Sequence, residues 1–125
     1  MNKKIIHTDQ APAAIGTYSQ AVLSGETLYL SGQIPLDPQS GALISDAIEP
    51  QIHQVFKNLA AVLQAAEKNF HHVVQLRIYL LSLEHFGLVN EIMAQYVPEP
   101  FPARAAIGVS QLPKGALIEI EGIAH

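Results

Sequence analysis

The stretch EPQIHQVFKNLAAVLQAAEKNFHHVVQLRIYL, residues 49–80, contains both of the hydrophobic periodicities that define this fold. Its first part repeats apolar residues at helical spacing, and Pro50 suits a first helical turn. The apolar face of that part consists of Ile52, Val55, Phe56, Leu59, Ala60, Leu63 and Ala66. Its last part alternates, with Val74, Leu76, Ile78 and Leu80 on one side of an extended chain. The stretch therefore predicts a helix over 49–67 and a strand over 73–80.

The flanking sequence predicts five further strands and one further helix. The strands are expected at 3–7, 19–24, 27–32, 103–110 and 116–124, and the helix at 84–97. Gly25-Glu26 predicts a tight hairpin turn, and Pro98 and Pro100 end the second helix. The order β-β-β-α-β-α-β-β favours one α+β domain over 1–125, a mixed sheet with two helices on one face. The other face of the sheet is then free to meet a partner subunit.

The composition narrows the possible partners and compartments. Charged residues make up 14% of the chain, against about 25% in typical soluble domains, and hydrophobic residues make up 49%. Burial of apolar surface against copies of the same chain is the simplest consequence, so we expect a homo-oligomer. The absence of cysteine excludes disulfides and thiolate chemistry and suits the cytoplasm. We expect neither a signal peptide nor a membrane-spanning segment.

The sequence lacks the motifs of most familiar catalytic and binding sites. The six histidines, His7, His53, His71, His72, His85 and His125, lack metal-ligand spacing. The serines lie in no G-x-S-x-G elbow, and the glycines are spaced as turn residues rather than as a phosphate-binding loop. We therefore expect no metal and no cofactor.

A sparse set of polar residues inside apolar segments remains. Arg104 in FPARAAIGV is the only charge of its stretch, and its planar group suits a carboxylate ligand. On the residues alone, an ion pair with Glu119 or Glu121 is the favoured interpretation. These two glutamates alternate with Ile118 and Ile120, so both project from one sheet face. That face could be an ordinary solvated one, or a desolvated cleft in which a carboxylate holds a water.

Five segments together resemble the RidA (YjgF) family of reactive-intermediate deaminases. They are APAAIGTYSQ (11–20), SGQIPLDPQSG (31–41), VNEIMAQY (89–96), FPAR (101–104) and LPKGALIEIEGIA (112–124). The resemblance implies a chorismate-mutase-like fold in a homotrimer with a central barrel and sites in clefts between subunits. It also implies hydrolysis of 2-imino acids, 2-iminobutanoate and 2-iminopropanoate, to 2-oxo acids and ammonia without a metal or cofactor.

The same resemblance assigns roles to seven residues. It makes Arg104 the clamp for the substrate carboxylate, Gly32 a backbone donor to that carboxylate, and Glu119 the holder of the attacking water. The main-chain carbonyl of Ala106 helps to hold the water, and Tyr18, Ser31 and Asn90 line the cleft. Three positions depart from the usual pattern: Ala106 replaces a frequent cysteine, Thr17 a proline, and Gly122 an alanine.

Two alternative functions stay open. One is an endoribonuclease or translation inhibitor, against which the net charge of −4 and the scattered basic residues argue. The other is a non-catalytic trimer that binds small carboxylates or acts as a chaperone. Such a protein would bind 2-oxobutanoate without accelerating the release of ammonia.

Overall fold

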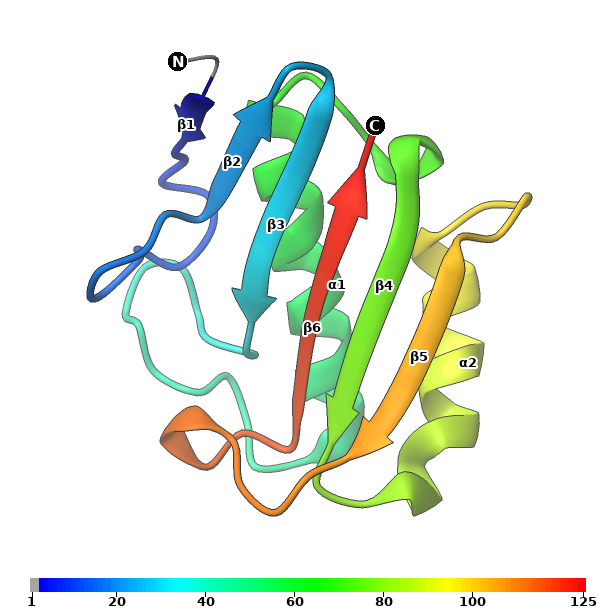
Figure 1. Ribbon diagram of the computed structural model, residues 1–125. Coiled ribbons are helices and arrows are strands. Elements are labelled where there is room, and N and C mark those ends of the chain that lie inside the picture. Colours follow the sequence, from blue (N-terminus) through cyan, green and yellow to red (C-terminus); the bar gives the residue numbers. More distant parts are fainter. Residues whose placement is uncertain (1–2) are drawn as a thin grey trace.

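Six strands form one mixed sheet with two α-helices on one of its faces (Figure 1). The computed structural model describes residues 3–125. The strands are β1 (Lys3–Ile6), β2 (Ala21–Ser24), β3 (Thr27–Gln33), β4 (Val73–Leu80), β5 (Ala103–Gly108) and β6 (Ile118–Ala124). The helices are α1 (Ile48–Ala65) and α2 (Phe86–Tyr96), with short 3-10 turns at Phe70–His72, Leu83–His85 and Pro113–Gly115. The predicted fold class and order of elements are confirmed.

The order of strands in the sheet is β1-β2-β3-β6-β4-β5. The two hairpin-like pairs β1–β2 and β2–β3 are antiparallel, and β6 inserts antiparallel between β3 and β4. β5 is parallel to β4, because α2 carries the chain back along the helical face before β5 begins. This crossover places β5 at the sheet edge with α2 beside it.

The core lies between the helices and one face of the sheet. The apolar stripe of α1 is fully buried at Ile52, Phe56, Leu59 and Leu63, as its periodicity predicts. Burial along β6 alternates strictly, so Ile118 and Ile120 face the helices while Glu119 and Glu121 face the opposite side. The sheet face away from the helices is therefore left uncovered by residues 3–125.

A register shift corrects the predicted alternation of β4. Val73 is 5% exposed and Val74 is 49% exposed, so the inward position is one residue earlier than the pattern 74, 76, 78, 80 requires. The pairing between β4 and β6 shifts between Val73 and Gln75. A Cβ on the facing Gly122 would lie 2.7 Å from the Gln75 carbonyl oxygen, so the close approach of the two strands favours glycine there.

The predicted second helix is divided into two parts. Residues Leu83–His85 form a 3-10 turn, with the Ser82 hydroxyl accepting from the Glu84 N–H, and α2 proper begins only at Phe86. Neither this helix nor any other in residues 3–125 is long and apolar enough to cross a membrane.

Candidate active site

Arg104 projects from the edge strand β5 toward α2. It pairs in register with Leu76, whose side chain is fully buried beneath the helices, so both side chains lie on the helical face. Its Nη1 donates to Oδ1 of Asn90 at 2.5 Å, and the guanidinium carbon lies 4.8 Å from the centre of the Phe86 ring. In residues 3–125 no carboxylate lies within 4.0 Å of Arg104, so the expected ion pair with Glu119 or Glu121 is wrong.

The guanidinium opens into a pocket of about 490 Å³. The pocket is lined by Asn90, Met93, Ala94, Phe101, Pro102 and Arg104. Nη1 donates both to Asn90 and, at 3.7 Å, to the Met93 sulfur, whereas within residues 3–125 the N–H donors on Nε and Nη2 have no partner and stay available to an anionic ligand. A planar cation held by an amide and an aromatic face, in otherwise apolar walls, suits a small carboxylate.

Glu119 lies on the uncovered face of the sheet, in a different pocket. This pocket has a volume of about 430 Å³ and is lined by Tyr18, Ser31, Gly32, Ile34, Pro113, Glu119 and Glu121. The Ser31 hydroxyl donates to the Ser19 carbonyl at 2.5 Å, and the Ser31 N–H donates to the Gln20 carbonyl. Ser31 therefore holds the loop that presents Tyr18, and the structure brings four of the seven expected residues together here.

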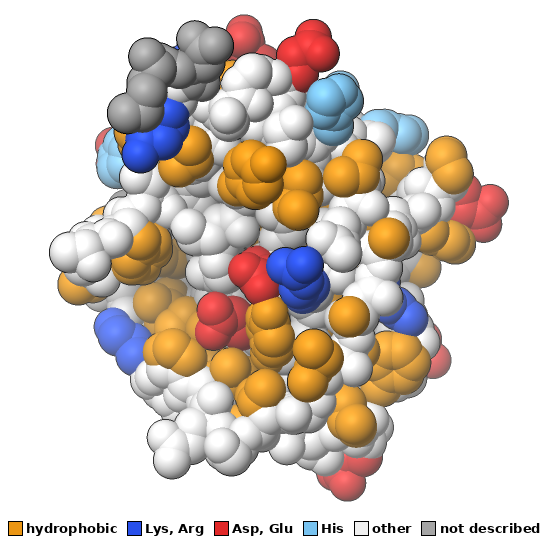
Figure 2. Space-filling model, viewed as in Figure 1, with side chains coloured by type: hydrophobic (Ala, Val, Ile, Leu, Met, Phe, Trp, Pro, Cys, Tyr) orange, Lys and Arg blue, Asp and Glu red, His pale blue; other side chains and the backbone are white. Residues whose placement is uncertain are grey.

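Charge and burial act together on Glu119. Burial, followed by the negative charge of Glu121, raises the pKa of the Glu119 carboxyl. Glu121 accepts a hydrogen bond from Tyr79 and lies 3.9 Å from Nη1 of Arg77, so its charge is held in place. Figure 2 looks onto this face and shows acidic and basic side chains meeting near its centre, with hydrophobic side chains around them.

Arg104 and Glu119 do not meet within one chain. Arg104 lies at the level of Leu76 on β4 and Glu119 at the level of Tyr79, on opposite faces of the sheet. Two strand spacings and three residues of rise separate their Cα atoms by roughly 14 Å. The two pockets share no lining residue. One chain therefore holds the expected site residues in two separate pockets, which we call the Arg104 and Glu119 half-sites.

The other expected residues divide between these half-sites. Asn90 lies with Arg104, and Ala106 follows two residues later on the same face of β5, half-buried against the core. Sequence reasoning missed Phe86 and Met93 beside the guanidinium, and Arg77 and Tyr79 beside Glu121. In the alternating pattern of residues 73–80, Arg77 and Tyr79 lie on the side opposite to Leu76 and Ile78, and this is the sequence signal that could have indicated them.

Gly32 gives the first test of the Glu119 half-site. A Cβ at this position would lie 2.0 Å from Oε2 of Glu119, so Gly32→Ala must displace the carboxylate. Because the clash falls on the end of a flexible side chain, we expect Tm to change little while activity falls by about 100-fold. Gly87→Ala is the matched control, since nothing lies within 4 Å of its added Cβ. Thermal unfolding and rate measurements on both variants check this, and full activity of Gly32→Ala would contradict it.

The sequence of this chain is similar to those of known proteins. The family model described as endoribonuclease L-PSP matches residues 8–125. The human protein named 2-iminobutanoate/2-iminopropanoate deaminase is 48% identical over 122 residues, which cover 98% of this chain and 89% of the human protein.

Solved structures agree with this match. RidA from the Antarctic bacterium Psychrobacter sp. superposes with a TM-score of 0.94 at 44% identity over 98% of both chains. TdcF of E. coli with bound serine superposes with a TM-score of 0.90 at 34% identity over 97% of both chains.

Proposed function

The chain belongs to the endoribonuclease L-PSP family, which includes RidA, and from that premise we propose that it is a deaminase of 2-imino acids. Its substrates are 2-iminobutanoate and 2-iminopropanoate, and its products are the 2-oxo acids and ammonia. The observation that carries the proposal is the Arg104 guanidinium, which is held by Asn90 and Phe86 and opens into an apolar-walled pocket. Relatives 47–49% identical that are named for this activity, and a relative that holds serine, support it.

The complete site is proposed to form between two copies of the chain. Arg104 and Asn90 of one copy face Tyr18, Ser31, Gly32 and Glu119 of the next, because one chain holds these groups on opposite sheet faces. The uncovered face carries exposed apolar side chains, among them Tyr29, Val74 and Ile107, which association would bury. We propose a homotrimer whose sheets line a central barrel, acting in the cytoplasm.

The chemistry requires little beyond orientation. Arg104 binds the substrate carboxylate with two parallel N–H···O bonds, and the Gly32 N–H adds a third donor. Glu119, with the Ala106 carbonyl, holds a water whose oxygen forms a bond to the C=N carbon as the π electron pair of that bond moves to nitrogen; Glu119 takes one proton from the water and passes it to this nitrogen. The hydroxyl proton of the resulting carbinolamine is then passed by Glu119 to the amino nitrogen, the C–N bond breaks with its electron pair on nitrogen, and ammonia leaves as the C=O bond of the 2-oxo acid forms.

The assay must exceed a chemical background, because free imines also hydrolyse in water. Threonine dehydratase supplies 2-iminobutanoate in situ, and the rate of 2-oxobutanoate formation is compared with and without the protein. We expect the protein to accelerate the reaction when its own concentration is far below that of the 2-iminobutanoate formed by the dehydratase. Binding of 2-oxobutanoate without acceleration would instead support the non-catalytic interpretation.

Because the matching family is described as endoribonuclease L-PSP, an endoribonuclease is the second candidate function. The chain has seven Lys and Arg residues against eleven Asp and Glu residues, and its candidate site places two carboxylates on the face where a polyanion would have to lie. RNA cleavage that is retained by Arg104→Ala and falls steeply with added salt would favour that candidate over the deaminase.

The pH dependence of a Glu121 variant tests the proposed role of Glu119 in holding the water. Activity requires ionised Glu119, so raising its pKa moves the acid limb of the kcat/KM profile to higher pH. Glu121→Gln removes the second cause of that rise, and we expect the acid limb to move to lower pH. Glu26→Gln, at the opposite end of β3, is the control that should leave the limb in place. An unchanged limb in Glu121→Gln would contradict the role of Glu119.

A further inference from the structure

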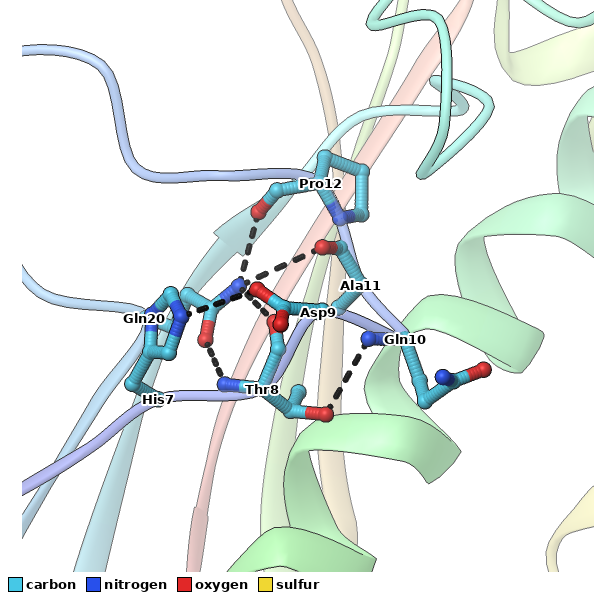
Figure 3. A network of polar contacts seen from close by, with 7 residues as sticks. All are labelled: His7, Thr8, Asp9, Gln10, Ala11, Pro12 and Gln20. Carbon is cyan, nitrogen blue, oxygen red and sulfur yellow. Dashed lines mark hydrogen bonds and ion pairs between the residues drawn. The ribbon is translucent and has the colours of Figure 1, made fainter.

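Three buried amide side chains hold the backbone in place and are fully occupied in doing so. Nε2 of Gln20 donates to the carbonyls of Thr8 and Pro12 at 3.0 and 2.8 Å, and its Oε1 accepts from the Thr8 N–H at 2.7 Å (Figure 3). Gln51 and Asn58 likewise donate to backbone carbonyls. In the described part of the chain no buried side-chain nitrogen or oxygen lacks a partner, so these amides point to no further ligand.

The Met93 thioether is a buried group of a different kind, because it contacts a side chain of the candidate site. Met93 lies on α2, is 5% exposed and packs into the hydrophobic core. Its Sδ accepts from Nη1 of Arg104 at 3.7 Å, next to the hydrogen bond from the same nitrogen to Asn90. Met93 also lines the pocket of about 490 Å³ into which the guanidinium opens. The side chain therefore lies between the core and the space proposed for the substrate.

Met93 carries the only sulfur atom of residues 3–125. The chain has no cysteine and two methionines, and the second methionine, Met1, lies outside the described residues. The sulfur of a thioether is a nucleophile, which peroxides oxidise to a sulfoxide. Cysteine thiolates are the usual first targets of peroxides, and this chain has none. Oxidation of the described chain at sulfur therefore falls on Met93.

We propose that Met93 is an oxidation site that regulates the Arg104 half-site, because its sulfoxide weakens binding of the substrate carboxylate. The inference rests on the proposed deaminase function, in which Arg104 binds that carboxylate. The oxidant is a peroxide: a sulfur lone pair forms the S–O bond as the O–O bond of hydrogen peroxide breaks. The second oxygen leaves as hydroxide, takes the remaining proton of the transferred hydroxyl group and becomes water. Sulfur loses two electrons, and a methionine sulfoxide reductase, with a thiol as reductant, returns them.

The sulfoxide oxygen weakens carboxylate binding in either direction that it can take. The remainder of the Met93 side chain packs in the apolar core, where a polar oxygen is unfavourable, so the oxygen lies toward Arg104 or toward the pocket. Toward Arg104, it accepts from Nη1 far more strongly than the thioether does, and its negative charge offsets part of the positive charge that attracts the carboxylate. Toward the pocket, it occupies space beside the bound carboxylate and repels the carboxylate oxygens.

Treatment of the purified protein with hydrogen peroxide, under conditions that oxidise free methionine, tests the site. Mass spectrometry of the peptide that contains Met93 follows the gain of one oxygen atom, and calorimetry gives the Kd of 2-oxobutanoate. We expect this Kd, and the KM for 2-iminobutanoate, to rise by on the order of tenfold and to return after reduction by methionine sulfoxide reductase. Unfolding would lower kcat instead. Saturating 2-oxobutanoate should slow the oxidation of Met93 in the wild type, because the ligand fills the pocket, but not in Arg104→Ala.

The Met93→Leu variant identifies the residue responsible, since it keeps the apolar volume and removes the sulfur. Compared with its own untreated sample, it should show no rise in Kd, although Met1 is oxidised in both proteins. The proposal is overturned if Met93 stays reduced in the folded wild type, if Kd is unchanged once Met93 is oxidised, or if Met93→Leu responds as the wild type does. Reversal by the reductase tests the wild type even if the variant does not fold. Failure to hydrolyse 2-iminobutanoate before treatment overturns the deaminase function alone, because the Kd of 2-oxobutanoate still tests Met93; absence of 2-oxobutanoate binding overturns both.

Discussion

Arg104→Ala is expected to lower kcat/KM for 2-iminobutanoate by on the order of 100-fold or more, because it removes a charge-assisted pair of hydrogen bonds worth roughly 2–5 kcal/mol. The loss should fall on substrate binding, since the proposed contact of Arg104 is with the substrate carboxylate and not with the reacting carbon. Arg104 is exposed and lies at the sheet edge, so Tm should change little. The measurement is 2-oxobutanoate formation above background, with Tm followed in parallel.

Arg104→Lys is the matched control for charge. It keeps the positive charge but loses the planar fork that binds a carboxylate at two points and donates to Asn90. We expect activity between that of the wild type and that of Arg104→Ala. If Arg104→Ala releases ammonia as fast as the wild type, the carboxylate clamp lies elsewhere.

The fold could be predicted from the sequence because its elements are encoded locally. The change of period between 49–67 and 73–80, the turn at Gly25-Glu26 and the prolines after α2 define elements without reference to distant residues. The bulge of β4 could not be predicted in this way. It depends on the approach of the Gln75 carbonyl to Gly122, which lies 47 positions along the chain and on a different strand.

The site shows the same division between local and distant information. Arg104 and Glu119 stand out in the sequence because each is a charge in an apolar segment. Their relation to one another depends on register, and register places Arg104 on the helical face and Glu119 on the open face. Composition alone favoured an ion pair between them, since it carries no information on which face each side chain occupies. The guanidinium instead lies against Phe86 and Asn90, because the crossover of α2 sets them beside β5.

Mixed oligomers of Arg104→Ala and Glu119→Gln are expected to regain activity that neither variant has alone. Each variant should be nearly inactive, since every site it forms lacks either the clamp or the water-holding carboxylate. After denaturation and refolding together in equal amounts, a site between two copies draws Arg104 from one chain and Glu119 from another. Random assortment then gives about one quarter of the sites both native residues. The rate of the refolded mixture, compared with each variant refolded separately, measures this.

Recovery of activity discriminates between the two possible arrangements of the site. If Arg104 and Glu119 of the same chain acted together, each chain of a mixed oligomer would still lack one group, and mixing would restore nothing. The two residues lie on opposite faces of the sheet, so we expect the arrangement that is shared between copies. The control is a double variant, Arg104→Ala with Glu119→Gln, refolded in equal amounts with the wild type. In this mixture a site shared between two copies is intact only where both copies are wild type, so about one quarter of the sites should again be intact. Activity near one quarter in both mixtures would assign the two half-sites to different copies. Activity in the control alone would refute the shared site.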